Sequence, residues 1–373
     1  MPLITLLLIL LLSCQDDSNS PASQKNPHNP SLDQVDDSHL ERIEGEKILE
    51  DKEDKALEAE EKQEKEEKTP NDEVSLPPKA PVKSYQGFAT ENGGTIGAGD
   101  GRVVIVTKKE AFLAAIKSKE PLVIKVAATI YLSGMHHVAS HKTILGVEDR
   151  GVLSGGGLNL SNVTNIIIKN LLFTDSNDDA INIEGSSNIL IENNDLREAK
   201  DGLIDIKKQS DFITIAWNHF TDHEKTCLLS SSDSDKDDKD HLRVTYHHNF
   251  FDGTSGRHPR VRFSKLTHVY NNYYLDNNYG IASTQGANVL VEGNYFENVT
   301  DPLRVTQGSS QKGFIEHRDN GYFDGQKSDI VSSFLARPPY EYEIDKADMV
   351  PKIVRERAGR KGYASDHLEA NGA

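Results

Sequence analysis

A weak repeat built around asparagine constrains the fold of this chain more than any other feature. Short runs of alternating apolar residues end in asparagine at Asn170, Asn194, Asn218, Asn249, Asn272 and Asn294, which gives steps of 24, 24, 31, 23 and 22 residues. A second short strand-like run follows each asparagine. A period in the low twenties with alternating apolar residues is typical of a coiled solenoid of strands, in which equivalent residues stack one above another.

The asparagines are expected at the bends of this coil. A side-chain amide at a bend can bond to the local backbone and to the next amide in the stack. His247, His248 and His268 lie in or near the same bend segments. They could form a metal-binding trio, but we favour stacked corner histidines. The polar insert 230–240, SSSDSDKDDKD, explains the one long step as a loop that leaves the coil.

The composition divides the chain into three segments. Residues 1–14, MPLITLLLILLLSC, form an apolar run too short to span a bilayer and typical of a signal sequence. Its ending predicts a bacterial lipoprotein signal with lipid on Cys14; the alternative is an ordinary secretory signal. Residues 15–84 hold 20 acidic and 10 basic residues, so a net charge of −10 out of −17 lies there. This composition predicts a disordered acidic linker, and the acidity of the chain therefore says little about its ligand.

Residues 85–373 are predicted to form one all-β domain, with a helix at about 108–118 as an N-terminal cap. An open coil exposes backbone edges and its apolar interior, and a helix at the first turn would cover both. Thr107 and Glu110 have the spacing of a capping box at the start of this helix.

Four charged residues follow the rhythm of the repeat. Asp179, Asp201, Lys225 and Arg257 are 22, 24 and 32 residues apart, with the same single long step as the asparagines. We therefore expect each residue to stand on the next rung of the coil, about 4.8 Å from its neighbour. Asp205 lies four residues after Asp201 and would project to the same face of a strand.

Three converging carboxylates, from Asp179, Asp201 and Asp205, would repel one another unless a cation lay between them. Hard oxygen ligands in a surface groove suit Ca²⁺. The acidic end of the column therefore predicts a calcium site.

The other end of the column is basic, with Lys225, Arg257, Arg260 and Arg262. Guanidinium groups bind carboxylates at two points. A cation site beside fixed positive charge would bind an extended polyanion whose carboxylates recur at sugar spacing. Neutralising such a carboxylate favours proton abstraction from the adjoining carbon, followed by β-elimination of the 4-O-glycosidic bond.

Two other uses of these charges remain open. Paired acids on a β-solenoid could hydrolyse a glycosidic bond, which requires a protonated acid near the scissile oxygen. The charges could also form a salt-bridge ladder without catalytic function. The acids are clustered without an isolated acid and basic residues dominate the other half of the column, which favours elimination over hydrolysis. Seven charges at rung-matched positions exceed what solvated faces usually show, which disfavours a salt-bridge ladder.

Several motifs resemble the pectate lyases of polysaccharide lyase family one. These are RHPRVRF (257–263), DGLIDI (201–206), TYHHNFF (245–251) and HVYNNYY (268–274), and the resemblance extends from about Tyr85 to Gly362. It implies a right-handed parallel β-helix, calcium-dependent cleavage of polygalacturonate and an unsaturated product. Pectin lyases of the same fold act on methyl esters and lack the acid set, so the acids favour the de-esterified substrate.

The resemblance also implies roles for single residues. Arg257, the first arginine of R-x-P-x-x-R, is similar to the arginine taken as the catalytic base. Arg262 and Lys225 resemble residues that grip the substrate carboxylate, and we place Arg260 with them as substrate-binding. The calcium ligands of the family correspond to Asp179, Asp201 and Asp205.

The chain departs from the family pattern at three places. Asn177-Asp178-Asp179 replaces an Asp-Gly-Asp calcium motif, so one calcium ligand of the family is weakened or replaced. Leu190-Ile191-Glu192-Asn193 stands where W-I-D-H is frequent, and His258 occupies a usually apolar place. These changes also support an alternative, a glycan-binding lipoprotein that has lost turnover.

We further expect a monomer that is secreted or anchored to the outer membrane through the lipid on Cys14. The polysaccharide is its expected partner, and no nucleic-acid partner is expected.

Overall fold

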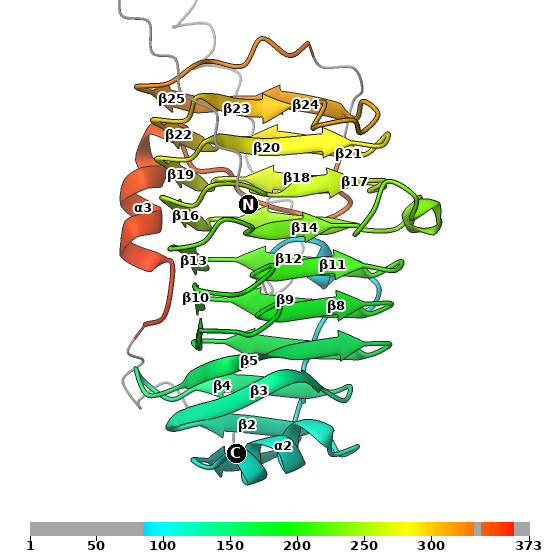
Figure 1. The fold of residues 1–373 in the computed structure, drawn as a ribbon, viewed down its shortest axis with the longest axis vertical. Helices are drawn as coiled ribbons and strands as arrows, with labels where there is room; N and C mark the ends of the chain where they lie inside the picture. The colour runs from blue at the N-terminus through cyan, green and yellow to red at the C-terminus, as the bar shows by residue number, and fades with distance from the viewer. Residues whose placement is uncertain (1–84, 332–336, 362–373) are drawn as a thin grey trace, which may run out of the picture. The chain divides into compact units, whose positions relative to one another are not determined.

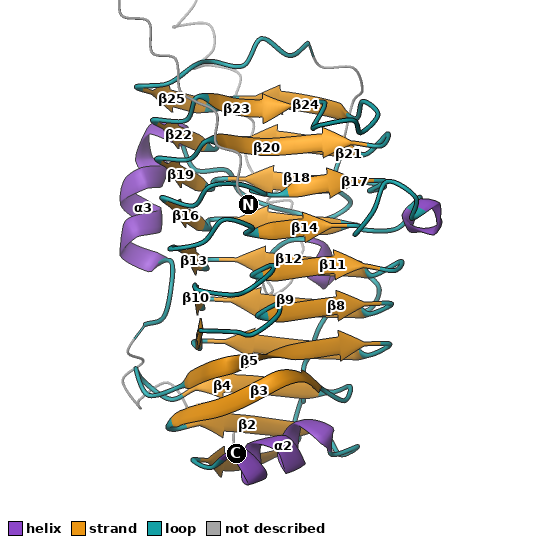
Figure 2. Cartoon of the chain, in the orientation of Figure 1, coloured by secondary structure: helices purple, strands orange, loops and turns teal. Residues whose placement is uncertain are grey.

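The protein is a coil of parallel strands that stack along the long axis (Figure 1). This computed structural model describes residues 85–331 and 337–361. The predicted signal sequence, 1–14, and the predicted linker, 15–84, lie outside the described residues. Strand dominates the described part, with helix confined to one end, one side and short turns (Figure 2). This architecture confirms the predicted parallel β-helix.

One side of the coil is a ten-stranded sheet. Its strands pair in parallel with the strands of the preceding and following turns. In spatial order they are β1 (Arg102–Val106), β2 (Leu122–Val126), β4 (Lys142–Gly146), β6 (Thr164–Lys169), β9 (Ser187–Glu192), β12 (Asp211–Ala216), β15 (Val244–His247), β18 (Thr267–Tyr270), β21 (Asn288–Glu292) and β24 (Phe314–Arg318).

A 15-stranded sheet supplies the remaining strands, two of them in each of the central turns. The long strand β5 (Val152–Ser161) pairs with β3 (Thr129–His137) and joins two runs of strands, because its two halves pair with different partners. The first run is β8 (Ile181–Glu184), β11 (Ile204–Lys207), β14 (Cys227–Leu229), β17 (Arg260–Arg262), β20 (Tyr279–Thr284) and β23 (Asp301–Arg304). The second is β7 (Leu172–Thr174), β10 (Asp195–Leu196), β13 (His219–Phe220), β16 (Phe250–Asp252), β19 (Tyr273–Leu275), β22 (Tyr295–Glu297) and β25 (Gly321–Phe323).

The interior is filled by apolar side chains that stack from turn to turn. An aromatic column runs through Phe220, Phe251, Tyr274 and Phe296, whose ring centroids are 5.0, 4.9 and 4.6 Å apart in succession. All four rings are buried. Since parallel strands place like residues at the strand spacing, one aromatic residue per turn is enough to build a continuous stack.

The asparagines form the predicted ladder at one bend, with one correction. Each buried amide donates to the Oδ1 atom of the asparagine one turn later, at 2.9 to 3.1 Å, from Asn194 through Asn218, Asn249, Asn272 and Asn294 to Asn320. Asn170 was predicted to begin the ladder, but Leu171 is the residue that stands below Asn194. Asn170 occupies the preceding position, which has a left-handed backbone (φ 57°) and favours asparagine for that different reason.

The helix α2 (Lys109–Lys117) covers the first turn, as predicted (Figure 1). Phe112 and Ile116 are fully buried and belong to the main core. The predicted capping box of Thr107 and Glu110 is wrong, because Lys108 is the N-cap residue and no side chain caps the helix. The helix therefore begins one residue later than the predicted capping box requires.

Two segments outside the repeat lie against the coil. The stretch 87–98 crosses the ten-stranded sheet on its way to the first turn, and the helix α3 (Val350–Arg357) packs beside β16 and β19 (Figure 1). The stretch 87–98 is fastened by hydrogen bonds from Phe88 to Thr245, Ala89 to Thr214, Asn92 to Asn188, Ile96 to Asn165 and Ala98 to Thr143. Gly87 is required where this stretch begins, since a Cβ atom there would lie 2.5 Å from Thr214 Oγ1. Neither described α-helix has the length and apolar character of a membrane span.

Candidate active site

The four residues of the predicted charged column lie just before four neighbouring strands. Asp179 precedes β8, Asp201 precedes β11, Lys225 precedes β14 and Arg257 precedes β17. These strands are successive and parallel, so their starts share one edge of the sheet. The structure therefore brings the four side chains together, as the repeat predicts.

At its acidic end the column differs from the prediction by one residue. β11 pairs with β8 at a step of 23 residues, whereas Asp179 and Asp201 are 22 residues apart. Asp201 therefore lies opposite Asp178, and Gly202 lies opposite Asp179. The Gly202 N–H accordingly donates to Asp179 Oδ1 at 2.7 Å. β14 also pairs with β11 at a step of 23 residues, whereas Asp201 and Lys225 are 24 residues apart. Asp179, Lys225 and Arg257 therefore share one register position with Gly202, and Asp201 lies one residue before it. Counting between charged residues could not reveal this shift, because the residue in register on β11 is an uncharged glycine.

Three carboxylates meet at this edge. Asp178, Asp179 and Asp201 each contribute an oxygen atom, and these atoms lie within 4.8 Å of one another. In the described ranges this is the only group of three such side chains with the proximity of metal ligands. Asp178 was not among the predicted ligands, although its place beside Asp179 in the altered calcium motif was a signal that could have found it.

Asp205 adjoins this cluster from the strand itself. A Cβ atom placed on Gly202 would lie 2.2 Å from Asp205 Oδ1 and 3.1 Å from Asp179 Oδ1, so Asp179 and Asp205 flank the same backbone position. The assumption that Asp201 and Asp205 project together from one strand is wrong, because β11 begins at Ile204. Asp201 reaches the cluster from the turn and Asp205 from the strand.

The carboxylates differ in their electrostatic surroundings. Burial and the nearby charge of Asp179 raise the pKa of Asp205 to about 7, and its Oδ1 atom is buried without a hydrogen-bond partner. Burial also raises the pKa of Asp179, against the hydrogen bond from Gly202 and the charge of Lys207. Burial alone would raise the pKa of Asp201 as well. The hydrogen bond from Lys225 and its positive charge outweigh burial and hold the pKa of Asp201 below its usual range.

These surroundings fit a calcium ion. The cluster offers several carboxylate oxygens, which are the hard ligands that Ca²⁺ prefers. Burial, and then neighbouring carboxylates, raise the pKa values of Asp179 and Asp205, and Asp205 Oδ1 is buried without a hydrogen-bond partner among the described residues. A bound cation would offset both the burial and the repulsion. Asp179, Asp201 and Asp205, with Asp178, are the residues that could hold the ion.

The basic half of the site begins one turn further along the coil. Lys225 Nζ lies 2.9 Å from Asp201 Oδ1, and Arg257 Nη1 lies 3.9 Å from the same oxygen. Arg257 has a left-handed backbone (φ 62°), and its N–H donates to the hydroxyl of Tyr279 at 2.7 Å. The same conformation recurs at many corners of the coil, so it places the Arg257 side chain without by itself indicating function. The side chain of Arg257 is 23% exposed, which leaves it accessible from the groove.

Arg260 and Arg262 project from β17 beside Arg257. Burial and the nearby charges of Arg262 and Arg257 lower the pKa of Arg260, which shows that the three guanidinium groups are close enough to interact. Arg262 is held by Asp233, a residue of the insert 230–240, through an Nε to Oδ1 bond of 2.7 Å. The sequence predicted the arginines but gave no reason to pair Asp233 with one of them.

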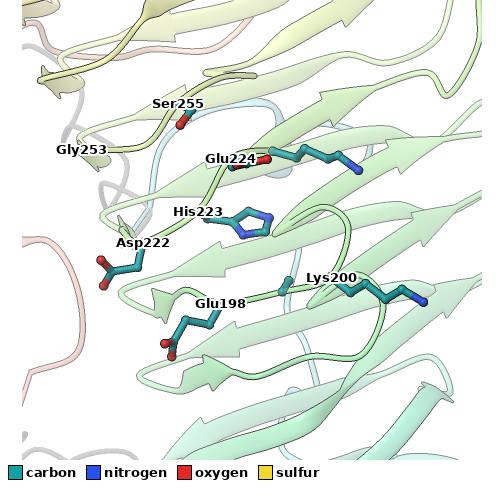
Figure 3. A pocket seen from close by; sticks show the side chains of 9 residues that line it. Glu198, Lys200, Asp222, His223, Glu224, Gly253 and Ser255 are labelled. Carbon is teal, nitrogen blue, oxygen red and sulfur yellow. The ribbon is translucent and has the colours of Figure 1, made fainter. Parts of the chain in front are cut away.

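A pocket of about 300 Å³ adjoins the charged edge (Figure 3). It is lined by the loops before β11, β14 and β17, including Lys200, His223, Glu224 and Lys225. The ring of His223 contributes directly to the site, because its Nε2 atom bonds to the backbone oxygen of Asp201 at 2.5 Å. His223 thus fixes the turn that carries Asp201, a role that the sequence analysis missed.

The other histidines that the sequence analysis singled out have structural surroundings. His258, beside the predicted base, is fully buried and bonds to Thr254 and to the backbone oxygen of Tyr279, and burial lowers its pKa to about 4. His247 and His268 stack on Tyr270, and His248 stacks on Trp217. These contacts support stacked corner histidines over a metal-binding trio.

Comparison with known proteins identifies the family. The family model described as pectate lyase matches residues 77–337, which is more than half of the chain. The chain belongs to the pectate lyase family. Among curated pectate lyase relatives, the pectate trisaccharide-lyase of Bacillus licheniformis is 37% identical over 300 residues, which cover 74% of this chain and 86% of the relative. Pectate lyase A of Emericella nidulans is 35% identical over 286 residues, with the same coverage.

Solved pectate lyase structures agree in fold. A pectate lyase from Bacillus sp. N165, crystallised in complex with trigalacturonate, superposes with a TM-score of 0.70 at 30% identity, covering 75% of this chain and all of that chain. Pectate lyase II of Xanthomonas campestris has a TM-score of 0.62 at 25% identity, covering 73% of this chain and 97% of that chain. The expected fold and family are therefore confirmed, while the roles of single residues remain predictions.

Proposed function

We propose that this polysaccharide lyase cleaves polygalacturonate, the de-esterified form of pectin, by calcium-assisted β-elimination. The observation that carries the proposal is the shared edge of β8, β11, β14 and β17, where a carboxylate cluster adjoins Lys225 and three arginines. When bound at this cluster, calcium would offset the charge of a substrate carboxylate and acidify the adjoining C–H bond.

The residues of the chain itself would carry the proton and hold the substrate. Lys225 and Arg262 bind the uronate carboxylate, and Arg260 adds positive charge beside them. Arg257 takes the proton from C5, a step that requires its guanidinium to lose a proton to solvent as the substrate binds. The electron pair of that C–H bond forms the C4–C5 double bond, and the C4–O bond breaks. The departing oxygen then takes a proton from water, which leaves an unsaturated sugar at the new chain end.

The buried position of Asp205 favours elimination over hydrolysis. A hydrolase needs a protonated carboxylic acid in contact with the scissile oxygen. Asp205 has the raised pKa that such an acid requires, but it is only 4% exposed. A sugar bond in the groove could not reach it, so Asp205 fits a cation ligand and not a general acid.

One assay separates the candidate functions. The purified protein is incubated with polygalacturonate in calcium, and ultraviolet absorbance from the new C4–C5 double bond is followed together with reducing ends. Elimination predicts a rise in both, which EDTA abolishes and calcium restores. Reducing ends without absorbance would indicate hydrolysis, and binding without any product would indicate the glycan-binding alternative.

Asp201→Asn tests the calcium site in the same assay. The variant should need more calcium for half-maximal activity, and part of the activity should return at saturating calcium because the other carboxylates remain. An unchanged calcium requirement would remove Asp201 from the ligand set.

We also propose that the protein acts at the bacterial cell surface as a lipid-anchored monomer. The support is the apolar run 1–14 that ends at Cys14 and the acidic spacer that follows it. Cells expressing the wild type should incorporate labelled palmitate into the protein, whereas cells expressing Cys14→Ser should not. Light scattering of the purified soluble form should give the mass of one chain.

A further inference from the structure

The insert 230–240 brings the carboxylate of Asp233 into contact with Arg262 of the candidate active site. Asp233 Oδ1 accepts a hydrogen bond from Arg262 Nε at 2.7 Å, and Arg262 Nη1 donates to the backbone oxygen of Ser230 at 2.9 Å. The side chain of Arg262 is only 8% exposed, whereas that of Asp233 is 37% exposed. The arginine is therefore largely buried and fixed, whereas the aspartate that binds it is partly exposed to solvent.

A second loop completes the surroundings of this carboxylate. Ser310 donates to Asp233 Oδ1 at 2.9 Å and accepts from Arg260 Nη2 at 3.0 Å. The Nε atom of Arg260 is buried without a hydrogen-bond partner. The two loops and the two arginines line a pocket of about 410 Å³. It has the groups that a carboxylate ligand needs, namely two guanidinium groups and a hydroxyl donor.

The charge of Asp233 is well stabilised in this position. Burial acts to raise the pKa of its carboxyl, but the hydrogen bonds from Ser310 and Arg262 outweigh burial and hold the pKa below its usual range. The side chain is thus an anionic carboxylate with the donors that a uronate would use. A substrate carboxylate that reaches Arg262 meets a site that is already filled.

We propose that Asp233 is a specificity-determining residue: its carboxylate occupies the Arg260–Arg262 pocket in the free protein, and a uronate carboxylate of the substrate must displace it. The inference rests on the proposed function, because it assumes an anionic sugar chain in the groove. Substrate binding at this pocket exchanges the carboxylate of Asp233 for that of a uronate. This exchange weakens the net binding of the substrate at the pocket. A chain long enough to occupy the calcium end and the pocket at once is favoured over a short one, since its other contacts offset the displacement of Asp233.

The test compares two aspartates of the same insert. Asp233→Asn and Asp233→Ala remove the competing charge, whereas Asp240→Asn removes one charge from an aspartate that forms an ion pair with Lys265 at 3.3 Å and lies largely in solvent. KM and kcat for polygalacturonate and for trigalacturonate are measured on the full chain at fixed ionic strength and calcium. Circular dichroism and thermal unfolding check that each variant is folded.

Both Asp233 variants should lower KM for polygalacturonate by about three- to tenfold relative to Asp240→Asn, with a smaller change in kcat and a larger fall in KM for trigalacturonate. In an Arg262→Ala background, Asp233→Asn should have no further effect on KM, because the arginine that Asp233 binds is absent.

A rise in KM for Asp233→Ala would overturn the proposal, since Asp233 would then anchor Arg262 and not compete for it. A fall no larger than that of Asp240→Asn would also overturn it, because general repulsion would suffice. Absence of unsaturated product from the wild type would instead refute the proposed function.

Discussion

The asparagine ladder and the charged edge are built by the same stacking but have opposite energetics. In the ladder, each amide is both donor and acceptor, so an identical neighbour one turn away satisfies it. At the charged edge, stacked carboxylates accept only, and Asp205 is left with a buried oxygen that has no partner. Stacking of identical side chains stabilises the coil when each side chain can both donate to and accept from the next one. When the stacked side chains only accept hydrogen bonds, the same stacking produces a site that needs a ligand.

The first prediction separates activity from stability at the charged edge. Arg257→Lys keeps the positive charge but removes the planar fork and changes its reach, so kcat should fall by about 10³ or more if Arg257 takes the proton. Thermal unfolding and substrate binding should change little. Near-normal turnover would show that another group is the base.

The second prediction concerns the centre of the ladder. Asn249→Ala removes the acceptor of two bonds from Asn218 and the donor of bonds to Ile215 and Asn272, all of them buried. The free energy of unfolding in urea should fall by about 3 kcal/mol, because several polar groups lose their partners. Asn320→Ala, at the more exposed end, is the control and should cost less. Equal losses would mean that position in the ladder does not matter.

The third prediction tests whether the charged edge is destabilising without its ligand. The pKa of Asp205 is raised to about 7, so the folded protein binds more protons than the unfolded chain above the usual carboxyl pKa and up to about pH 7. Stability conferred by the protonated form is lost as pH rises through that window. In EDTA at pH 8, Asp205→Asn should therefore raise the free energy of unfolding by about 2 kcal/mol.

At pH 4 the difference between Asp205→Asn and the wild type should nearly vanish. Asp201→Asn is the matched control of opposite sign, since Lys225 lowers the pKa of Asp201 despite its partial burial. It should lower the thermal unfolding temperature at pH 8. If Asp205→Asn destabilised the protein at pH 8, the view of this edge as a strained ligand site would be wrong.

The fourth and smallest effect is expected at the basic end. Arg262→Ala should raise KM for polygalacturonate by about tenfold while kcat changes less, because the residue contributes binding and not proton transfer. Initial rates over a range of substrate concentrations measure both constants. A fall in kcat equal to the loss in kcat/KM would move Arg262 into the chemical step.

The sequence analysis predicted the coil because its signals are local and repeated. Alternating apolar residues and an asparagine per turn are visible in any single repeat, so an error in one repeat does not affect the others. Asn170 shows where this reasoning fails, because it looks like a member of the ladder in the sequence. It lies one residue before the ladder position, where a left-handed backbone favours asparagine for another reason. Thr107 failed in the same way, because a capping signal cannot fix a helix start to one residue.

The site was harder to predict because its contacts join distant segments. The repeat brought Asp201, Lys225 and Arg257 together, but it could not show that Asp201 lies one residue out of register with the other members of the column. It also could not show that Asp178 joins the carboxylate cluster. Asp233 lies in an insert without periodicity, so its bond to Arg262 had no sequence signal. Such pairings depend on how a loop folds back, which composition and spacing do not determine.

The stretch 87–98 has a consequence for how the coil unfolds. A stack of turns that touch only their neighbours can fray from an end, one turn after another. This stretch bonds to β15, β12 and β4 and to Asn188 and Asn165 in β9 and β6, so it fastens five turns with a single piece of chain. If one of these turns opened, its hydrogen bond to the stretch 87–98 would break, while the other four turns would still hold the stretch in place. Unfolding of these five turns is therefore expected to be cooperative.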